Sequence, residues 1–244
     1  MQQLPVLRYR RYVNNETRDR IVDVAAQLMQ QHGPSGVTTR GVAQGAGVQA
    51  PTIYRLFGDK NGLLEAVAEH VMSTFVAAKA AIVEEASASG VDPLDDLRDG
   101  WRTQIDFGVA NPAVFRLLSD PERVLGSPAA ELGRGVLHAR VHRLAETGRL
   151  RVSERRAVDV IQAAGVGAIN VILSTPLERR DPDFADDLFA AVLAQILTDA
   201  PPAGESGVKA TTVALRALTP RLDMLSDAER HVLDEWLDRA IAAM

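Results

Sequence analysis

Two pairs of residues in this chain have a spacing that could do chemistry, and neither completes a known site. His138 and His142 are four residues apart, so on a helix their imidazoles share one face, which suits a metal ion. The general-base glutamate of a zinc protease would fall at Ala139, however, and the sequence shows no evident third ligand. Gly165 and Gly167 lack the third glycine and the preceding strand of a dinucleotide-binding turn. We therefore expect no catalytic residues, no metal site and no cofactor, and we expect that the protein is not an enzyme.

The composition excludes further classes. The 244 residues include no cysteine, which excludes disulfides and cysteine-ligated zinc or iron–sulfur sites. A hydrophobic content of 46% is typical of a chain with a folded core rather than a mainly disordered one. The longest uninterrupted apolar runs are far shorter than the roughly 20 residues that span a membrane, and the first residues do not form a signal peptide. We expect a soluble, cytoplasmic protein that has no membrane partner.

The net charge of −5 is unevenly distributed along the chain. Residues 1–60 contain eight lysines and arginines and four acidic residues, a balance of +4, so the other residues sum to −9. Such asymmetry is typical of a polyanion-binding segment joined to another domain, although a chance difference of this size is not rare. The overall acidity therefore does not argue against a nucleic-acid partner.

The apolar spacing predicts an all-α fold. Apolar residues recur at intervals of three and four between Gly- and Pro-containing breaks, and alternating β-branched strands are absent. Ala200–Gly207 has the composition of a flexible linker, and two helical stretches follow it. The predicted helices before this linker cover residues 15–33, 39–46, 51–57, 60–85, 93–109, 112–118, 128–147, 153–175 and 182–198.

The most informative segment is residues 38–64, where two short helices are joined by a turn that contains Gly45 and Gly47. Val42 would pack the first helix, and Ile53 and Leu56 would hold the second against the core while its other face stays polar. A helix presented by such a rigid module fits the major groove of DNA, so this is a helix-turn-helix pattern. A plain helical hairpin would have a similar pattern, and this alternative stays open on spacing alone.

The run TTRGVAQGAGVQAPTIYRLFGDKNGLLEAV, at residues 38–67, resembles the DNA-binding region of TetR-family repressors. The family pattern has a Thr-Thr start, an Ala-Gly-Val turn, Thr-[Leu/Ile]-Tyr-x-x-Phe, and a Lys followed by a Leu pair. The resemblance covers about residues 15–72, with departures at Gln49, where Ser is usual, and at Pro51, where Gly is common. The matching residues are Thr38, Thr39, Ala43, Ala46, Gly47, Val48, Thr52, Ile53, Tyr54, Phe57, Lys60, Leu63 and Leu64.

This resemblance implies which residues meet DNA. Threonines at a helix N-terminus would contact phosphate, Gln49 could pair with adenine, and an Ala or Pro surface could touch a thymine methyl. Core packing is the alternative for Tyr54, and helix capping is the alternative for Thr52. The expected DNA-binding residues are Thr38, Thr39, Arg40, Gln49, Ala50, Pro51, Thr52, Tyr54, Arg55 and Lys60.

The resemblance also implies that the later helices bind a small-molecule effector and form a homodimer. The helices at 153–175 and 182–198 would pair with those of a second copy, although an ordinary monomeric core would show the same apolar faces. The residues expected at the dimer face of the first of these helices are Val158, Ile161, Gln162, Gly165, Ala168, Ile169 and Ile172. The candidate lining of a pocket for a largely apolar effector is Trp101, Ile105, Phe107, Phe115, His138 and Asn170, although each of these is more often core or surface.

Four segments follow from these predictions. We expect a flexible basic arm over residues 1–14, a helix-turn-helix DNA-binding domain over 15–60, and a helical ligand-binding and dimerisation domain over 61–200. Residues 201–244 would be a linker and a helical extension, which we expect to dock on the sensing domain because Trp236 and several leucines would otherwise be exposed.

The sequence thus predicts a ligand-responsive DNA-binding regulator, most simply a repressor that binds a palindromic operator in double-stranded DNA as a homodimer. The alternative is a TetR-like scaffold that serves as a protein-interaction module without specific DNA recognition. The retained Thr52, Tyr54 and Lys60 argue against that alternative.

Overall fold

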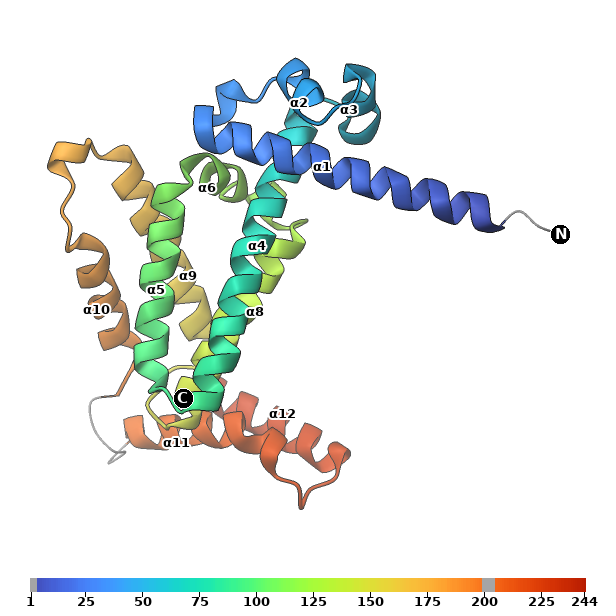
Figure 1. The fold of residues 1–244 in the computed structure, drawn as a ribbon. Helices are drawn as coiled ribbons and strands as arrows, with labels where there is room; N and C mark the ends of the chain where they lie inside the picture. The colour runs from blue at the N-terminus through green and yellow to red at the C-terminus, as the bar shows by residue number, and fades with distance from the viewer. Residues whose placement is uncertain (1–3, 199–204) are drawn as a thin grey trace. The chain divides into compact units, whose positions relative to one another are not determined.

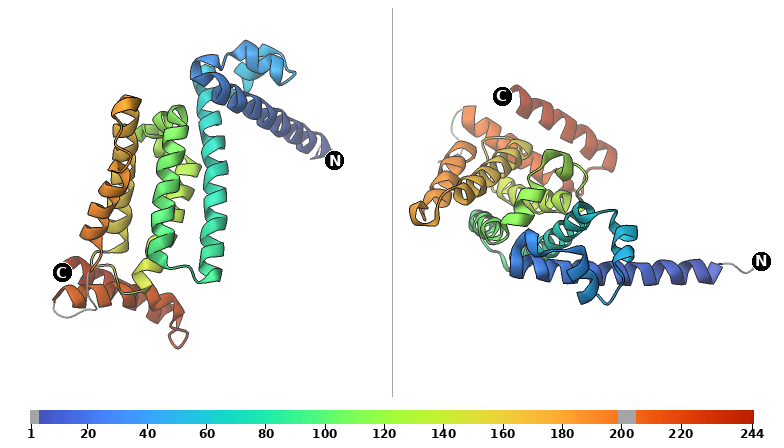
Figure 2. Two further views of the ribbon diagram at one scale, coloured as in Figure 1. Left: turned by 60° about the vertical axis from the view of Figure 1, so that its left-hand side comes forward. Right: turned by 90° about the horizontal axis from the view of Figure 1, so that it is seen from above.

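The computed structural model describes residues 4–198 and 205–244 (Figures 1 and 2). Within these residues the regular elements are helices, and a single isolated bridge joins Leu150 and Leu197, so the all-α prediction is confirmed. The α-helices are α1 (Leu4–Gly36), α2 (Thr39–Gly45), α3 (Ala50–Phe57), α4 (Lys60–Ser89), α5 (Pro93–Ala110), α6 (Pro112–Leu118), α7 (Pro121–Val124), α8 (Pro128–Glu146), α9 (Glu154–Ser174), α10 (Phe184–Ile196), α11 (Glu205–Leu218) and α12 (Asp227–Ala243).

The N-terminal segment differs from its prediction. We expected Asn15 to cap the first helix after a flexible arm over residues 1–14, but α1 begins at Leu4 and continues through Asn15. No glycine interrupts residues 4–32, and Pro5 falls in the first turn, where its missing N–H removes no helical hydrogen bond. Residues 1–3 and the side chains of the basic residues at 8–12 lie outside the described part of the chain. The predicted break at Gly33 is present, since Gly33 has a φ of 68° and a non-helical ψ.

Local capping signals place the other helix ends. The Thr38 side chain accepts a hydrogen bond from the Gly41 N–H at 3.0 Å at the start of α2, and Asp59 accepts from the Gly62 N–H at 2.9 Å at the start of α4. Ser153 caps α9, and Ser226 forms the predicted capping box of α12. These ends agree with the predicted ones because each depends on residues within one helical turn.

Three segments that the sequence predicts as loops or linker contain helical residues. The short α7 lies in the region predicted as loop after Asp120, and a 3₁₀ turn covers Leu177–Arg179. α11 starts at Glu205, inside the segment predicted as a linker. Ser206 and Gly207 of that segment lie in the first turn of α11, and its residues 200–204 lie outside the described residues.

The chain divides into two compact units at places other than the predicted domain boundaries. The first unit comprises residues 1–77 and 111–131, so it includes the first part of α4 together with α6 and α7. Its core combines the apolar faces of α1 to α4, with buried side chains from Ile21, Val42, Ile53, Leu63 and Val67. The boundary with the second unit, residues 78–110 and 132–244, falls inside α4.

The second unit is built around α5, α9 and α10. Gly108 of α5 lets Ile169 of α9 approach, since a Cβ at position 108 would lie 2.6 Å from the Ile169 Cδ1 atom. The Trp101 ring stacks on Phe189 of α10 at a centroid distance of 4.6 Å and donates from Nε1 to the Ala185 carbonyl at 3.1 Å. These contacts fix three helices with side chains that no local sequence pattern would connect.

The predicted dimer face of α9 is largely an internal face. Val158, Ile161, Gly165, Ala168 and Ile169 are buried within the single chain, against α5 and α10, so assigning this face to a second copy was wrong. The sequence could not separate the two cases, because a helix packed on its own chain and a helix packed on a partner show the same apolar period.

The C-terminal helices dock on the second unit. α11 and α12 pack on each other (Figure 1). The Arg221 guanidinium pairs with Glu146 of α8 at 3.0 Å. Ala210, Val213 and Ala217 are buried, whereas Trp236 remains 60% exposed. We predicted that these helices dock because Trp236 and several leucines would otherwise be exposed, but Trp236 itself stays mostly exposed.

Two helices, α4 and α9, are long and apolar enough by composition to cross a membrane. This is a weak indication, since core helices of soluble proteins share these properties, and α9 packs against α5 and α10 within its unit.

A matched pair of glycine substitutions tests the backbone of the turn. Gly47 has a φ of 64°, which a side chain disfavours, so we expect Gly47→Ala to lower the free energy of unfolding by roughly 1–2 kcal/mol. Gly135 lies inside α8 with open space around its Cα, so Gly135→Ala should raise that free energy by roughly 0.5–1 kcal/mol. Urea unfolding of both variants measures the two signs, and destabilisation by Gly135→Ala would contradict this account.

Candidate functional site

The turn between α2 and α3 is held by its own backbone. The Ala46 N–H donates to the Val42 carbonyl at 2.9 Å and the Val48 N–H donates to the Ala43 carbonyl at 3.0 Å, while Gly47 supplies the positive φ. Gly45 permits close approach to α1, because a Cβ there would lie 2.7 Å from a methyl carbon of Val24. These few local contacts therefore hold α2 and α3 in a rigid helix-turn-helix.

One face of α3 anchors it and the opposite face is open to solvent. Ile53 is fully buried, whereas Tyr54 beside it is 52% exposed, so the core-packing alternative for Tyr54 does not hold in this unit. Pro51 lies in the first turn of α3, where it fits the helix start. The helix is thus fixed to the core by its apolar side and presents polar groups on the other.

The predicted DNA-binding residues are all exposed or half-buried side chains of the first unit. Thr38 caps α2 through its oxygen, which leaves its hydroxyl hydrogen able to donate to another acceptor. The exposed members are Thr38, Arg40, Gln49, Pro51, Tyr54, Arg55 and Lys60, and the half-buried members are Thr39, Ala50 and Thr52.

Other contacts in the first unit were not predicted from the sequence. Arg18 of α1 lies over the Phe57 ring at 5.3 Å from its centroid, which ties α1 to the end of α3. Glu69 of α4 accepts hydrogen bonds from the Ser127 hydroxyl at 2.6 Å and the Ala129 N–H at 2.7 Å, at the start of α8. A residue separation of about 60 between these partners gives no local signal in the sequence.

The predicted effector-lining residues occupy different environments. Trp101 and Ile105 are buried on α5, whereas His138 of α8 and Asn170 of α9 are exposed. Of the two other members of this set, Phe107 is half-buried and Phe115 is buried in the first unit. The structure does not bring His138 and Asn170 to the buried environment of Trp101.

His138 and His142 share an acidic partner that the sequence did not reveal. The Glu154 Oε2 atom lies 3.1 Å from Nδ1 of His142 and 3.7 Å from Nε2 of His138. The hydrogen bond to Glu154 is the main cause that raises the pKa of His142, and the charges of Glu154 and Glu146 add to it. In the described ranges, no three His, Asp or Glu side chains are arranged to hold a metal ion, so this cluster is an ion-pair network.

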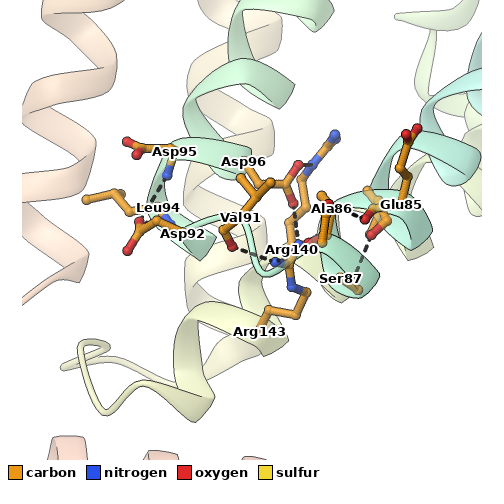
Figure 3. A network of polar contacts seen from close by, with 12 residues as sticks. Glu85, Ala86, Ser87, Val91, Asp92, Leu94, Asp95, Asp96, Arg140 and Arg143 are labelled. Atoms are coloured by element: carbon orange, nitrogen blue, oxygen red, sulfur yellow. Dashed lines mark hydrogen bonds and ion pairs between the residues drawn. The ribbon is translucent and has the colours of Figure 1, made fainter.

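A buried carboxylate joins α5 to α8 (Figure 3). Asp96 is 4% exposed and accepts hydrogen bonds from Nε of Arg140 at 3.1 Å and from Nη1 of Arg143 at 2.9 Å. Arg143 also donates from Nη2 to the carbonyl of Val91 at 3.0 Å and more weakly to that of Ala86 at 3.4 Å. This network fixes the end of α4 and the following loop to α5 and α8.

Lys79 of α4 lies near this network. Its ammonium donates to the Gln104 Oε1 atom at 3.0 Å, and burial together with the nearby charge of Arg140 lowers the pKa of Lys79 to about 8. The second unit therefore holds a half-buried cation on α4 and a buried cation on α8, and burial makes such charges costly.

Comparison with known proteins agrees with the helix-turn-helix geometry. Residues 21–67 match the family of bacterial regulatory proteins described as the tetR family. The chain is 36% identical over 56 residues to the class D tetracycline repressor protein of Escherichia coli, which is 23% of this chain and 26% of that protein. It is 38% identical over 63 residues to the transcriptional regulator BetI of Burkholderia thailandensis, covering 26% of this chain and 32% of BetI. The matched span is thus about a quarter to a third of these relatives.

Solved structures resemble a larger part of the chain. The structure of RolR in complex with resorcinol covers 83% of this chain and 95% of RolR, with a TM-score of 0.61 and 20% identity. FadR of Thermus thermophilus in complex with lauroyl-CoA covers 77% of this chain and 99% of FadR, with a TM-score of 0.57 and 21% identity. At these identities the likeness concerns the fold alone.

The first unit therefore defines a helix-turn-helix protein. Residues 21–67 are thus similar to the DNA-binding region of the tetR family of bacterial regulatory proteins, and the likeness to RolR and FadR shows an all-α fold over the remaining helices.

Removing the Lys79 charge tests the buried network. Because the pKa of Lys79 is lowered from 10.5 to about 8, the folded state holds this proton less firmly than the unfolded state does. The resulting cost is fully present below pH 8, decreases between pH 8 and 10.5, and is absent above that range. We expect Lys79→Met to raise the free energy of unfolding at pH 7 by roughly 1–2 kcal/mol, after the loss of the Gln104 hydrogen bond is included.

The advantage of Lys79→Met over the wild type should shrink between pH 8 and 10.5 in urea unfolding series. Lys79→Arg is the control, since its cation keeps its proton throughout this range and should remove the recovery of stability at high pH. Equal stability of the wild type and Lys79→Met at every pH would contradict the assignment.

Proposed function

We propose that this protein is a ligand-responsive DNA-binding transcriptional regulator, a cytoplasmic repressor that binds a palindromic operator as a homodimer. The observation that carries the proposal is the exposed polar face of α3 on a rigid helix-turn-helix, within the segment that matches the tetR family. A fixed helix with an open polar face is what insertion into the major groove requires.

Specificity and affinity would come from different residues. Gln49, at the start of α3, would read a base edge, and Pro51 would contact a thymine methyl. Thr38, Arg40 and Lys60 would hold phosphates on either side, since all three are exposed in the first unit. Gln49 and Pro51 stand where many relatives have Ser and Gly, so the operator would differ from theirs.

The outer faces of α9 and α10 would form the dimer interface. α9 exposes Ala163, Val166 and Gly167, and α10, which packs beside it, exposes Ala190 and Ala194. Small uncharged side chains permit close approach of a second copy, and an isologous contact would bring two recognition helices to successive half-sites.

The second unit would bind the effector. RolR was solved with resorcinol and FadR with lauroyl-CoA, and by likeness of fold we propose that this chain also responds to a small molecule. α4 belongs to both compact units, so a ligand that prefers one position of α4 would change the DNA-binding equilibrium.

Selection of bound DNA from a random pool tests the proposal, and a palindromic consensus is the expected result. Lys60→Ala should then weaken binding about uniformly across sequences and reduce the salt slope by about 1, because one phosphate contact is lost. Gln49→Ala should instead relax the preference at one position of each half-site, at about 1–3 kcal/mol. Lys209→Ala on α11 is the matched charge control. Failure to enrich any palindrome would contradict the proposal.

A second pair of variants tests the dimer. Gly167→Lys places a charge on the proposed interface, and we expect sedimentation to show monomers and DNA affinity to fall. Gly135→Lys makes the same change at an equally open helix position on α8 and should remain dimeric. An unchanged dimer in Gly167→Lys would show that the interface lies elsewhere.

A further inference from the structure

The buried network around Asp96 holds more positive than negative charge. The ion pairs of Arg140 and Arg143 both run to the single carboxylate of Asp96, so these three residues carry a net charge of +1. Both guanidinium groups are mostly shielded from solvent, since their side chains are 5% and 15% exposed. An uncompensated charge in such an interior is costly unless an anion joins it.

The two arginines differ in how much of their hydrogen-bonding capacity the protein uses. Arg143 donates to Asp96 and to two carbonyls, so its role is structural. In the described part of the chain, the hydrogen bonds of Arg140 run through Nε to Asp96 alone, and neither of its terminal amino groups is a fully buried atom without a partner, so both retain some contact with solvent. The Arg140 guanidinium lies against the bare Cα of Gly100, where a Cβ would be 2.6 Å from Nη1.

Lys79 and Gln104 add polar groups from the two adjacent helices. The charge of Arg140 contributes to the lowered pKa of Lys79 on α4, and the Lys79 ammonium donates to the Gln104 Oε1 atom at 3.0 Å. Because that oxygen accepts a hydrogen bond, the amide nitrogen of Gln104 remains as a donor. Half-buried donors from α4 and α5 are therefore present in the same unit as the buried guanidinium of α8.

We propose that the small molecule sensed by the second unit is a monocarboxylic acid, whose carboxylate is bound by the terminal amino groups of Arg140 with Lys79 and Gln104 beside it. This inference rests on the proposed effector-binding role of that unit, and it replaces the largely apolar effector expected from the sequence with one that has an acidic head. A planar carboxylate matches the fork of a guanidinium through two parallel hydrogen bonds. A single negative charge balances the excess of the three ion-paired residues, and the Lys79 ammonium leaves the occupied site with a net charge of +1.

The position of the site suggests how an acid would act. Lys79 lies on α4, two residues past the boundary of the compact units, whereas Arg140 lies on α8. A carboxylate held by both side chains would favour the arrangement of α4 that keeps them together. The acid would then bind one arrangement of α4 more tightly than the other, and this difference in affinity is what a ligand-controlled switch requires.

An isosteric substitution tests the charge excess without knowledge of the effector. Gln104→Glu supplies a carboxylate next to Lys79, and we expect the Tm at pH 7 to rise by about 2–6 °C. The control is Gln162→Glu, where the same change occurs at another half-buried glutamine, whose hydrogen bond from Arg134 at 2.8 Å is exposed to solvent. The control should shift the Tm by less than about 2 °C, as exposed ion pairs contribute little. A lower Tm in Gln104→Glu than in the wild type would overturn the proposal.

The second arm uses benzoate and benzamide, which share a ring and differ in the charged head. Benzoate should raise the Tm of the full-length wild type and of Gln162→Glu in a concentration-dependent way, and benzamide should have a smaller effect. Gln104→Glu should lose the preference, because its own carboxylate occupies the place of the ligand. Equal responses to benzoate and benzamide in the wild type would overturn the proposal.

These measurements use no DNA, so they separate two failures. If benzoate binds as expected but operator selection fails, the acid site holds and the regulatory role does not. If an operator is found but both ligands act equally, the regulator remains and its effector is not an acid.

Discussion

The pairing of Asp96 with two arginines is the interaction on which the second unit depends most. One carboxylate of α5 holds two side chains of α8, and Arg143 extends the contact to the backbone that follows α4. Three helices are therefore positioned by charge rather than by apolar packing alone. Buried ion pairs are geometrically demanding, so the network favours one arrangement of these helices more sharply than a purely apolar contact would.

Much of the fold could be predicted because its signals are local. Thr38, Asp59, Ser153 and Ser226 each cap a helix through an atom within one turn, and their positions agree with the structure. Where no local signal existed, the prediction failed. α1 continues past Asn15 because nothing in the preceding residues stops it, and only its tertiary setting could have fixed where it begins.

The candidate sites differ in the same way. The helix-turn-helix residues lie within about 30 positions of one another, so a motif can hold them together. Asp96 and Arg140 are 44 residues apart, and no spacing rule links them. The inner face of α9 shows a third limit, since Ile161 and Ile169 are buried by α5 and α10 within the chain, and periodicity does not reveal which surface covers an apolar stripe.

The length of α4 determines how far a small tilt of this helix displaces its ends. This helix runs from Lys60 to Ser89 without proline, and at 1.5 Å per residue it is about 45 Å long. A rigid rod of that length amplifies small rotations: a tilt of roughly 5° at one end displaces the other by about 4 Å. The displacement exceeds the 3.4 Å rise between successive nucleotides of a DNA strand. A tilt that begins at Lys79 has an arm of about 29 Å to Lys60, so the same tilt of roughly 5° would displace the N-terminal end of α4 by about 2.5 Å, a large part of one base step.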